Sequence, residues 1–202
     1  MALERYRDAD ENVDDRVKDL LGRMSADEKL AQLNAQPLME FSSEESDLRD
    51  LTHGVGFLDL SSAQALGTAE DAAARINEVQ HALVHNTRLG IPALVHSQSD
   101  CWERLGGVQF PSGLGLAATF SPSAARDMAR ETRDQLRAIG VRLAHSPLID
   151  IGRDPRWQRI ELSIGEDPYL AGRMAVALVR GLQGESLQDG VAAIAKHFVG
   201  YG

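Results

Sequence analysis

The chain has 202 residues, of which 43% are hydrophobic and 25% charged, the composition of an ordinary globular protein. Acidic residues number 30 against 21 basic ones, for a formal net charge of -9, and no lysine and arginine cluster offsets it, which argues against binding to nucleic-acid phosphates. Cys101 is the only cysteine, so no intrachain disulfide can form, and no apolar run approaches the ~20 residues that span a membrane.

The first residues are charged rather than apolar. Between Met1 and Asp8 the sequence mixes acidic, basic and small side chains. A secretory signal needs an apolar core of about 7–15 residues, and none is visible here. The sequence therefore predicts a cytoplasmic location, which a single unpaired cysteine also suits.

The amino-terminal part of the chain is predicted to begin with an amphipathic helix. Apolar residues recur at helical spacing over residues 12–24. Ser25 and Glu28 then have the spacing of a capping box, in which each side chain bonds the backbone N–H of the other residue. We expect a short second helix after Ser25 and, in the polar stretch 36–52, a loop that can include a helical turn.

The rest of the chain alternates between short apolar runs and longer helical patterns. The predicted strands cover residues 55–60, 93–95, 114–119, 141–144 and 191–195, and the predicted helices cover 69–88, 122–139 and 169–182. This alternation is typical of βα units on a parallel sheet. A closed eight-stranded barrel needs about 250 residues, so the pattern alone leaves open an open α/β sheet or an incomplete barrel.

Polar segments follow three of the predicted strands, at the positions where parallel α/β folds bind ligands. The first runs from His96 to Arg104, the second from Asp150 to Glu161, and the third begins at Lys196. The first segment mixes polar groups that could bind a hydroxylated ligand. Cys101 and His96 lie in it without further ligands at a recognised spacing, so we expect neither a metal nor a cofactor.

The second and third segments carry the strongest donors. Three arginines, three carboxylates and a tryptophan lie between Asp150 and Glu161. Lys196 offers three N–H donors and His197 a directional donor or acceptor, a combination that suits sugar hydroxyls. Residue chemistry alone leaves the structural alternatives open: a solvated polar loop in the first segment, an ion-pair network that pins a long loop in the second, and a solvated lysine beside a hydrogen-bonded histidine in the third.

Six segments, taken in chain order, resemble one known family. They are Met24–Leu33, Gly90–Pro92, Phe110–Thr119, Arg153–Arg159, Gly165–Leu170 and Ala195–Gly202. Together they are similar to glycoside hydrolase family 3, the group of β-glucosidases and β-xylosidases. The similarity runs from about Asp14 to the last residue, and six ordered segments make chance similarity very improbable.

The resemblance implies a fold and a reaction. It implies that residues 1–202 form a partial N-terminal domain, the first half of a (β/α)8 TIM-like barrel. It also implies retaining hydrolysis of terminal β-linked sugars in oligosaccharides or aryl and alkyl glycosides, by two carboxyl groups ~5 Å apart. In the family both carboxyl groups come later in the chain than the segments matched here, so we assign no catalytic residue.

The resemblance also implies site residues. Arg159, Lys196 and His197 match the residues with which the family holds the hydroxyls of the glycone, the sugar whose bond is cleaved. Glu161 matches a carboxylate close to that arginine, and we expect it to orient Arg159. Hydrogen bonds from such groups strengthen as the oxocarbenium-like transition state forms.

One position departs from the family pattern. Where the family usually has an acidic residue that binds glycone hydroxyls, this chain has Gln98, and Asp100 is the candidate substitute. An amide cannot make the charge-assisted hydrogen bond of a carboxylate, which is roughly twice as strong as a neutral one. The departure keeps a second hypothesis open, in which the chain is a sugar-binding remnant that binds through Arg159, Lys196 and His197 and hydrolyses nothing.

Overall fold

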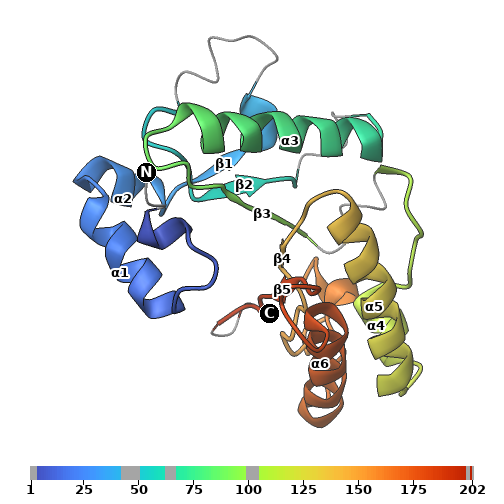
Figure 1. Ribbon diagram of the computed structural model, residues 1–202. Coiled ribbons are helices and arrows are strands. Elements are labelled where there is room, and N and C mark those ends of the chain that lie inside the picture. The colour runs from blue at the N-terminus through green and yellow to red at the C-terminus, as the bar shows by residue number, and fades with distance from the viewer. Residues whose placement is uncertain (1–3, 42–50, 62–66, 99–104, 199–200, 202) are drawn as a thin grey trace.

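The computed structural model describes residues 4–41, 51–61, 67–98, 105–198 and 201, and its centre is a parallel sheet (Figure 1). The strands are β1 (Ala35–Pro37), β2 (Phe57–Asp59), β3 (Leu94–Ser97), β4 (Leu143–Ala144) and β5 (Ala192–Ala193). Within the described ranges they pair in the order β1-β2-β3-β4-β5, every pair parallel. Each strand thus lies beside its predecessor, as in a barrel wall, without the order reversal of an open doubly wound sheet.

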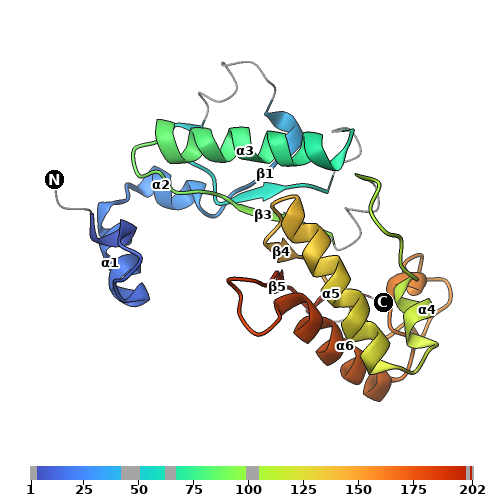
Figure 2. The ribbon, with the colours of Figure 1, turned by 45° about the vertical axis from the view of Figure 1, so that its right-hand side comes forward.

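Helices connect the strands. They are α1 (Val13–Arg23), α2 (Ala26–Ala31), α3 (Ala69–Asn86), α4 (Gly113–Ala117), α5 (Pro122–Ala138) and α6 (Pro168–Gln183), with 3-10 turns η1 (Arg5–Arg7), η2 (Leu38–Glu40) and η6 (Ile160–Leu162). In Figures 1 and 2, α3 lies along β1 to β3, and α5 and α6 lie side by side near β4 and β5. Every helix predicted from the periodicity is therefore confirmed, to within two or three residues at its ends.

Local capping explains where two of these helices begin. The Glu28 backbone N–H donates to Ser25 Oγ (3.2 Å) and the Ser25 N–H donates to the Glu28 carboxylate (2.8 Å), which is the predicted capping box. Helix α5 begins with Ser121 as its cap and Pro122 in the first turn, where a missing N–H costs nothing. The local sequence is thus sufficient to set these two boundaries.

One prediction is wrong, and one strand was not predicted. Residues 114–119 were expected to form a strand, but Gly113–Ala117 form helix α4, whose first turn is capped by a bond from the Gly115 N–H to Ser112 Oγ. A short apolar run cannot be assigned to strand or helix by periodicity alone. In the polar stretch 36–52 the sequence indicates a loop that can include a helical turn, and η2 is such a turn, but the first residues of the stretch belong to strand β1, which was not predicted. Proline is tolerated in β1 because that strand has only one partner among the described strands.

The two faces of the sheet differ in what covers them. Leu58, Val95 and Ala144 point to the face covered by helices and are almost fully buried. The helices fit closely there, since a Cβ on Gly181 of α6 would come within 2.5 Å of the Ala129 Cβ of α5. Neighbouring residues of a strand point to opposite faces, so Asp59 and its paired neighbour His96 point to the other face.

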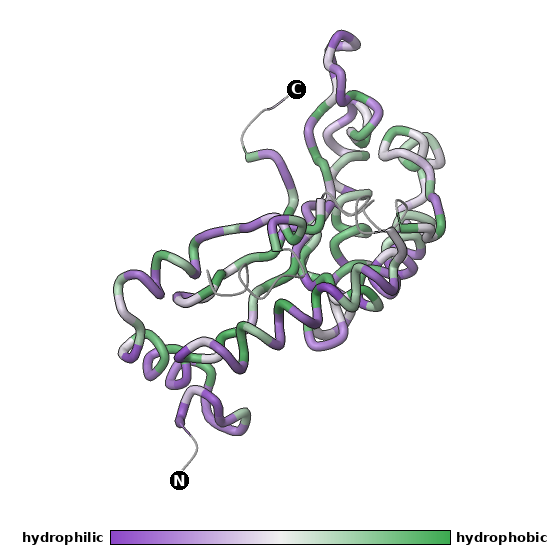
Figure 3. Tube along the Cα trace, turned by 90° about the horizontal axis from the view of Figure 1, so that it is seen from above, coloured by the Kyte–Doolittle hydropathy of each residue, from purple (hydrophilic) through white to green (hydrophobic). Residues whose placement is uncertain are grey.

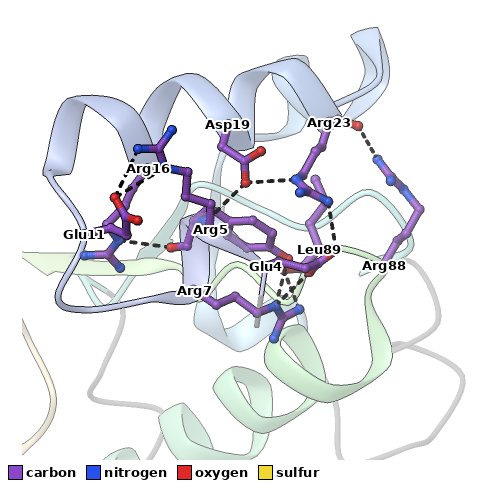
Figure 4. Close-up of polar contacts among 10 residues, drawn as sticks. Glu4, Arg5, Arg7, Glu11, Arg16, Asp19, Arg23, Arg88 and Leu89 are labelled. Carbon is purple, nitrogen blue, oxygen red and sulfur yellow. Dashed lines mark hydrogen bonds and ion pairs between the residues drawn. The ribbon is translucent and has the colours of Figure 1, made fainter. Parts of the chain in front are cut away.

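The amino-terminal segment is attached mainly by polar contacts, drawn in Figure 4. The Tyr6 hydroxyl and the Arg7 guanidinium both donate to the Leu89 carbonyl oxygen, at 2.8 and 3.0 Å. Arg23 binds Asp19 and Glu4 at 3.0 and 2.9 Å. We use the name N-terminal clamp for the polar cluster of Glu4, Arg5, Tyr6, Arg7, Glu11, Asp15, Asp19 and Arg23. Helix α1 has no buried residue, so polar contacts and the buried side chains of Tyr6 and Met24 on either side of it hold this segment.

Hydrophobic positions alternate with hydrophilic ones along the helices (Figure 3). In the part of the chain that the structure describes, no helix is both long enough and apolar enough to cross a membrane. Helices α3, α5 and α6 instead each use one apolar side to cover the sheet.

Candidate functional site

The segments after β3 and β5 meet through Lys196 and Gln98. Lys196 Nζ donates to Gln98 Oε1 at 2.8 Å, although the two residues lie 98 positions apart in the sequence. The backbone holds this arrangement: the Lys196 N–H donates to the Pro147 carbonyl at 3.0 Å and the Ile149 N–H to the Lys196 carbonyl at 2.8 Å. Because these bonds continue the parallel pairing beyond β4 and β5, Lys196 lies at the carboxyl edge of the sheet.

His197 is held by a buried carboxylate. Its Nδ1 lies 2.8 Å from Asp150 Oδ2, and the Asp150 side chain is only 2% exposed. The other oxygen, Oδ1, accepts from the Tyr201 backbone N–H at 3.3 Å. An ionised carboxylate can only accept, so Nδ1 carries the proton and Nε2 of the neutral ring is left as an acceptor. Asp150 thereby fixes both the tautomer and the orientation of His197.

Tyr201 connects the Arg159 segment to His197. Its ring centroid lies 4.4 Å from that of His197 and 5.8 Å from that of Trp157. The guanidinium carbon of Arg159 lies 5.5 Å from the Tyr201 ring centroid, within cation–π range. The structure therefore brings Arg159, Lys196 and His197 to one region, as the resemblance implies.

The arginine-rich segment divides into two parts. Asp154 and Arg156 bind each other at 2.6 Å, and the Arg156 side chain is 88% exposed. The hydrogen bond from Arg156 holds the pKa of Asp154 below its ordinary value. This pair is a local solvated contact between residues two positions apart, whereas Asp150 and Trp157 contact the His197 and Tyr201 region.

The role of Glu161 in orienting Arg159 stays a prediction. Both side chains are exposed, and among the described residues no ion pair joins them. With Gln98, Glu161 lines a cavity of about 330 Å³ among α4, α5, α6 and η6. Most of that lining is apolar, as at Phe110, Leu116 and Met128, so the polar strand edge fits a hydroxylated ligand better than the cavity does. Asp100 lies outside the described residues.

Two site residues were not singled out from the sequence. Asp150 follows an apolar pair, Leu148-Ile149, at the start of the arginine-rich segment, and Tyr201 follows His197 by four positions. An acidic residue directly after an apolar run was the available signal for Asp150. Nothing in the sequence indicated that Tyr201 contacts Trp157, because that contact depends on the tertiary fold.

The arrangement offers hydrogen-bonding groups of both kinds to a hydroxylated ligand. Lys196 brings a positive charge and donors, His197 Nε2 an acceptor and Arg159 a planar set of donors. Across the described ranges no three histidine, cysteine or acidic side chains are grouped so that they could hold a metal ion. Polar groups of this kind at the ends of parallel strands can bind a hydroxylated ligand.

The comparisons with known proteins agree with this fold. Residues 25–202 match the model of the glycosyl hydrolase family 3 N terminal domain, and the chain belongs to this family. A probable beta-glucosidase C of Aspergillus flavus is 34% identical over 98% of this chain and 34% of its own length. A putative beta-xylosidase of Formosa agariphila is 33% identical over 98% of this chain and 28% of its own length.

Solved structures show the same fold. A β-glucosidase from Erythrobacter marinus matches with a TM-score of 0.84 and 34% identity over 100% of this chain and 28% of that one. The β-glucosidase of Listeria innocua in complex with glucose matches with a TM-score of 0.71 and 29% identity, over 91% of this chain and 26% of that one. The chain spans about a third of the length of the curated relatives it matches, 34% for the Aspergillus flavus protein.

Proposed function

We propose that this chain supplies the glycone-binding wall of a retaining β-glycosidase that acts on terminal β-linked glucose or xylose. The observation that carries the proposal is the meeting of Lys196 with Gln98 at the carboxyl edge of the sheet, beside a His197 oriented by Asp150. Three separate segments contribute to this meeting, and such convergence of polar side chains at strand ends is typical of ligand sites in barrels. The names of the relatives as β-glucosidases and β-xylosidases support the same reading.

The geometry also gives Gln98 a definite role in this proposal. Its Oε1 accepts from Lys196, so its amide NH2 group is the part left to contact a ligand. A carboxylate at this position would accept from a sugar hydroxyl, whereas the amide donates to a hydroxyl oxygen. The glycone-binding wall would therefore be rich in hydrogen-bond donors. It would favour sugar hydroxyls whose oxygen accepts a hydrogen bond from these donors.

The test is the Lys196→Ala substitution in the complete protein that the source encodes. Lys196 donates directly to the glycone in this proposal, so kcat/KM for an aryl β-glucoside and an aryl β-xyloside should fall about 100- to 1,000-fold. Lys18→Ala is the matched control, because Lys18 is an exposed lysine of α1 and does not belong to the strand ends that form the site. Unchanged turnover in the Lys196 variant would remove this residue from the site.

A non-catalytic sugar-binding function is the second candidate, and Gln98 at the usual acidic position favours it. The complete protein would then bind glucose, measured by isothermal titration calorimetry, and release no product from either aryl glycoside. Binding should still disappear in the Lys196→Ala variant. Turnover in the unmodified protein would eliminate this second candidate.

A further inference from the structure

A second polar cluster, separate from Arg159 and His197, lies on the sheet face that the helices leave uncovered. Asp59 is the last residue of β2, His96 lies in β3 and His145 directly follows β4. The register pairs Asp59 with His96, and His145 lies two residues beyond Leu143, the partner of His96. Side chains two apart share a face, so all three point to the same side of the sheet.

The contacts connect the three side chains in a row, from His145 to His96 and from His96 to Asp59. His145 Nε2 lies 2.9 Å from His96 Nδ1, and the same His96 nitrogen lies 3.8 Å from Asp59 Oδ1. Asp59 Oδ1 is held by the Ser61 N–H at 2.8 Å and by the Ser61 hydroxyl at 2.5 Å. One nitrogen of the histidine pair must donate and the other accept, so a single proton lies between the two rings. Asp59 favours the tautomer in which His96 Nδ1 carries that proton.

Burial and neighbouring charges shift the pKa values of His96 and His145 to different extents. Burial lowers the pKa of His96, and the Asp59 carboxylate opposes that shift. Burial also lowers the pKa of His145, and the charges of His96 and Lys196 lower it further, against a weaker effect of Asp59. Asp59 from β2 and Lys196 from beyond β5 are the charged groups of the described structure that act on the pair. Burial therefore disfavours a positive charge on either ring, and the charge of Lys196 adds to this effect at His145.

We propose that Asp59, His96 and His145 are positioning residues for the sugar site, which keep the sheet face beside Lys196 uncharged at neutral pH and weaken sugar binding when they become protonated. A first proton, on His96, leaves the bond between the rings intact, because an imidazolium still donates to a neutral imidazole. A second proton, on His145, sets two N–H groups against each other and places a new positive charge near Lys196. Repulsion then displaces Lys196 from Gln98. The inference rests on the proposed function, since Lys196 belongs to that site.

Imidazole NMR spectra of the complete protein that the source encodes, recorded between pH 8 and pH 4.5, test the coupling directly. We expect His96 to titrate at a higher pH than His145, and each transition to change when the partner is replaced, in His145→Gln and His96→Gln. Asp59→Asn should move the His96 transition to lower pH. His81 of α3 is exposed and serves as the reference resonance. Independent transitions that ignore the partner's replacement would overturn the proposal.

Glucose affinity, measured by calorimetry at pH 7 and pH 5, tests the effect on the site. The unmodified chain and the His81→Gln control should lose about tenfold in affinity between these values, the effect expected of one unfavourable charge contact, and His145→Gln about threefold at most. An equal loss in all three, or no loss in the unmodified chain across the His145 transition, would overturn the proposal. Absence of glucose binding at every pH would instead overturn the sugar-wall function, and the NMR transitions alone would then decide the coupling.

Discussion

The N-terminal clamp and the carboxyl edge of the sheet are both built from charged and polar side chains, yet they differ in exposure. In the clamp, Arg5 is 52% exposed and binds Asp15, which is 48% exposed. At the sheet edge, Asp150 is 2% exposed and binds His197, which is 29% exposed. Ion pairs in solvent contribute little, whereas a buried carboxylate is costly unless every oxygen is bonded. The many charges of the N-terminal clamp therefore mark a solvated surface. The buried Asp150 carboxylate, whose two oxygens are both hydrogen-bonded, marks the candidate binding site.

The largest expected effect lies at the sheet edge. Asp150→Ala removes the buried acceptor of two partly buried hydrogen bonds, from the His197 ring and from the Tyr201 N–H, and should lower the free energy of unfolding by about 3 kcal/mol. Asp150→Asn keeps the shape and one acceptor oxygen and should cost about 1 kcal/mol. Equilibrium urea unfolding measures both. Equal, small losses in the two variants would contradict the role of Asp150 as the anchor of His197.

An intermediate effect on stability is expected at Glu28, which belongs to the capping box of α2 and pairs with Arg88. The hydrogen bond from Arg88, helped by the Ser25 N–H, lowers the pKa of Glu28 from 4.5 to about 2. Glu28→Ala removes the capping box and this ion pair, and should cost about 2 kcal/mol at pH 7. Asp27→Ala, in the same turn but exposed, is the matched control.

The pH dependence of that loss is a second readout. A lowered pKa means that the ionised form of Glu28 stabilises the folded chain above about pH 4.5, and that this contribution disappears as the pH falls towards 2. The difference in stability between the unmodified chain and Glu28→Ala should therefore shrink over this interval. A difference that stays constant down to pH 2.5 would show that Glu28 acts by packing alone.

The smallest effect is expected in the clamp itself. Arg5→Ala removes solvent-exposed contacts to Glu11 and Asp15, and should change the melting temperature by about 1 °C or less. Differential scanning fluorimetry at low and high salt measures it, and salt should abolish whatever difference remains. A large fall in melting temperature would mean that charge density in solvent does mark a structural element here, and the comparison of the two regions would fail.

Local chemistry allowed much of the fold to be predicted from the sequence. The helix after Ser25 and the helix after Ser121 start where their caps stand, because capping depends on residues three apart. The strand at Val95 followed from its apolar run. The α4 residues were predicted to form a strand because a run of five small and apolar residues fits a strand as well as a helix. The Ser112 cap is the local feature that favours the helix. The segments similar to family 3 likewise indicated Arg159, Lys196 and His197 before any contact was known.

The sequence by itself determined most of the helices and strands, the parallel α/β class and most of the residues that bring charge to the strand ends. Only the tertiary structure decided their partners. Gln98 meets Lys196, and Asp150 meets His197, because the parallel register aligns the ends of β3, β4 and β5. The same register places His96 beside His145. Local sequence fixes capping and periodicity, whereas a contact between residues about 50 or 100 positions apart depends on how strands align, which no local pattern encodes.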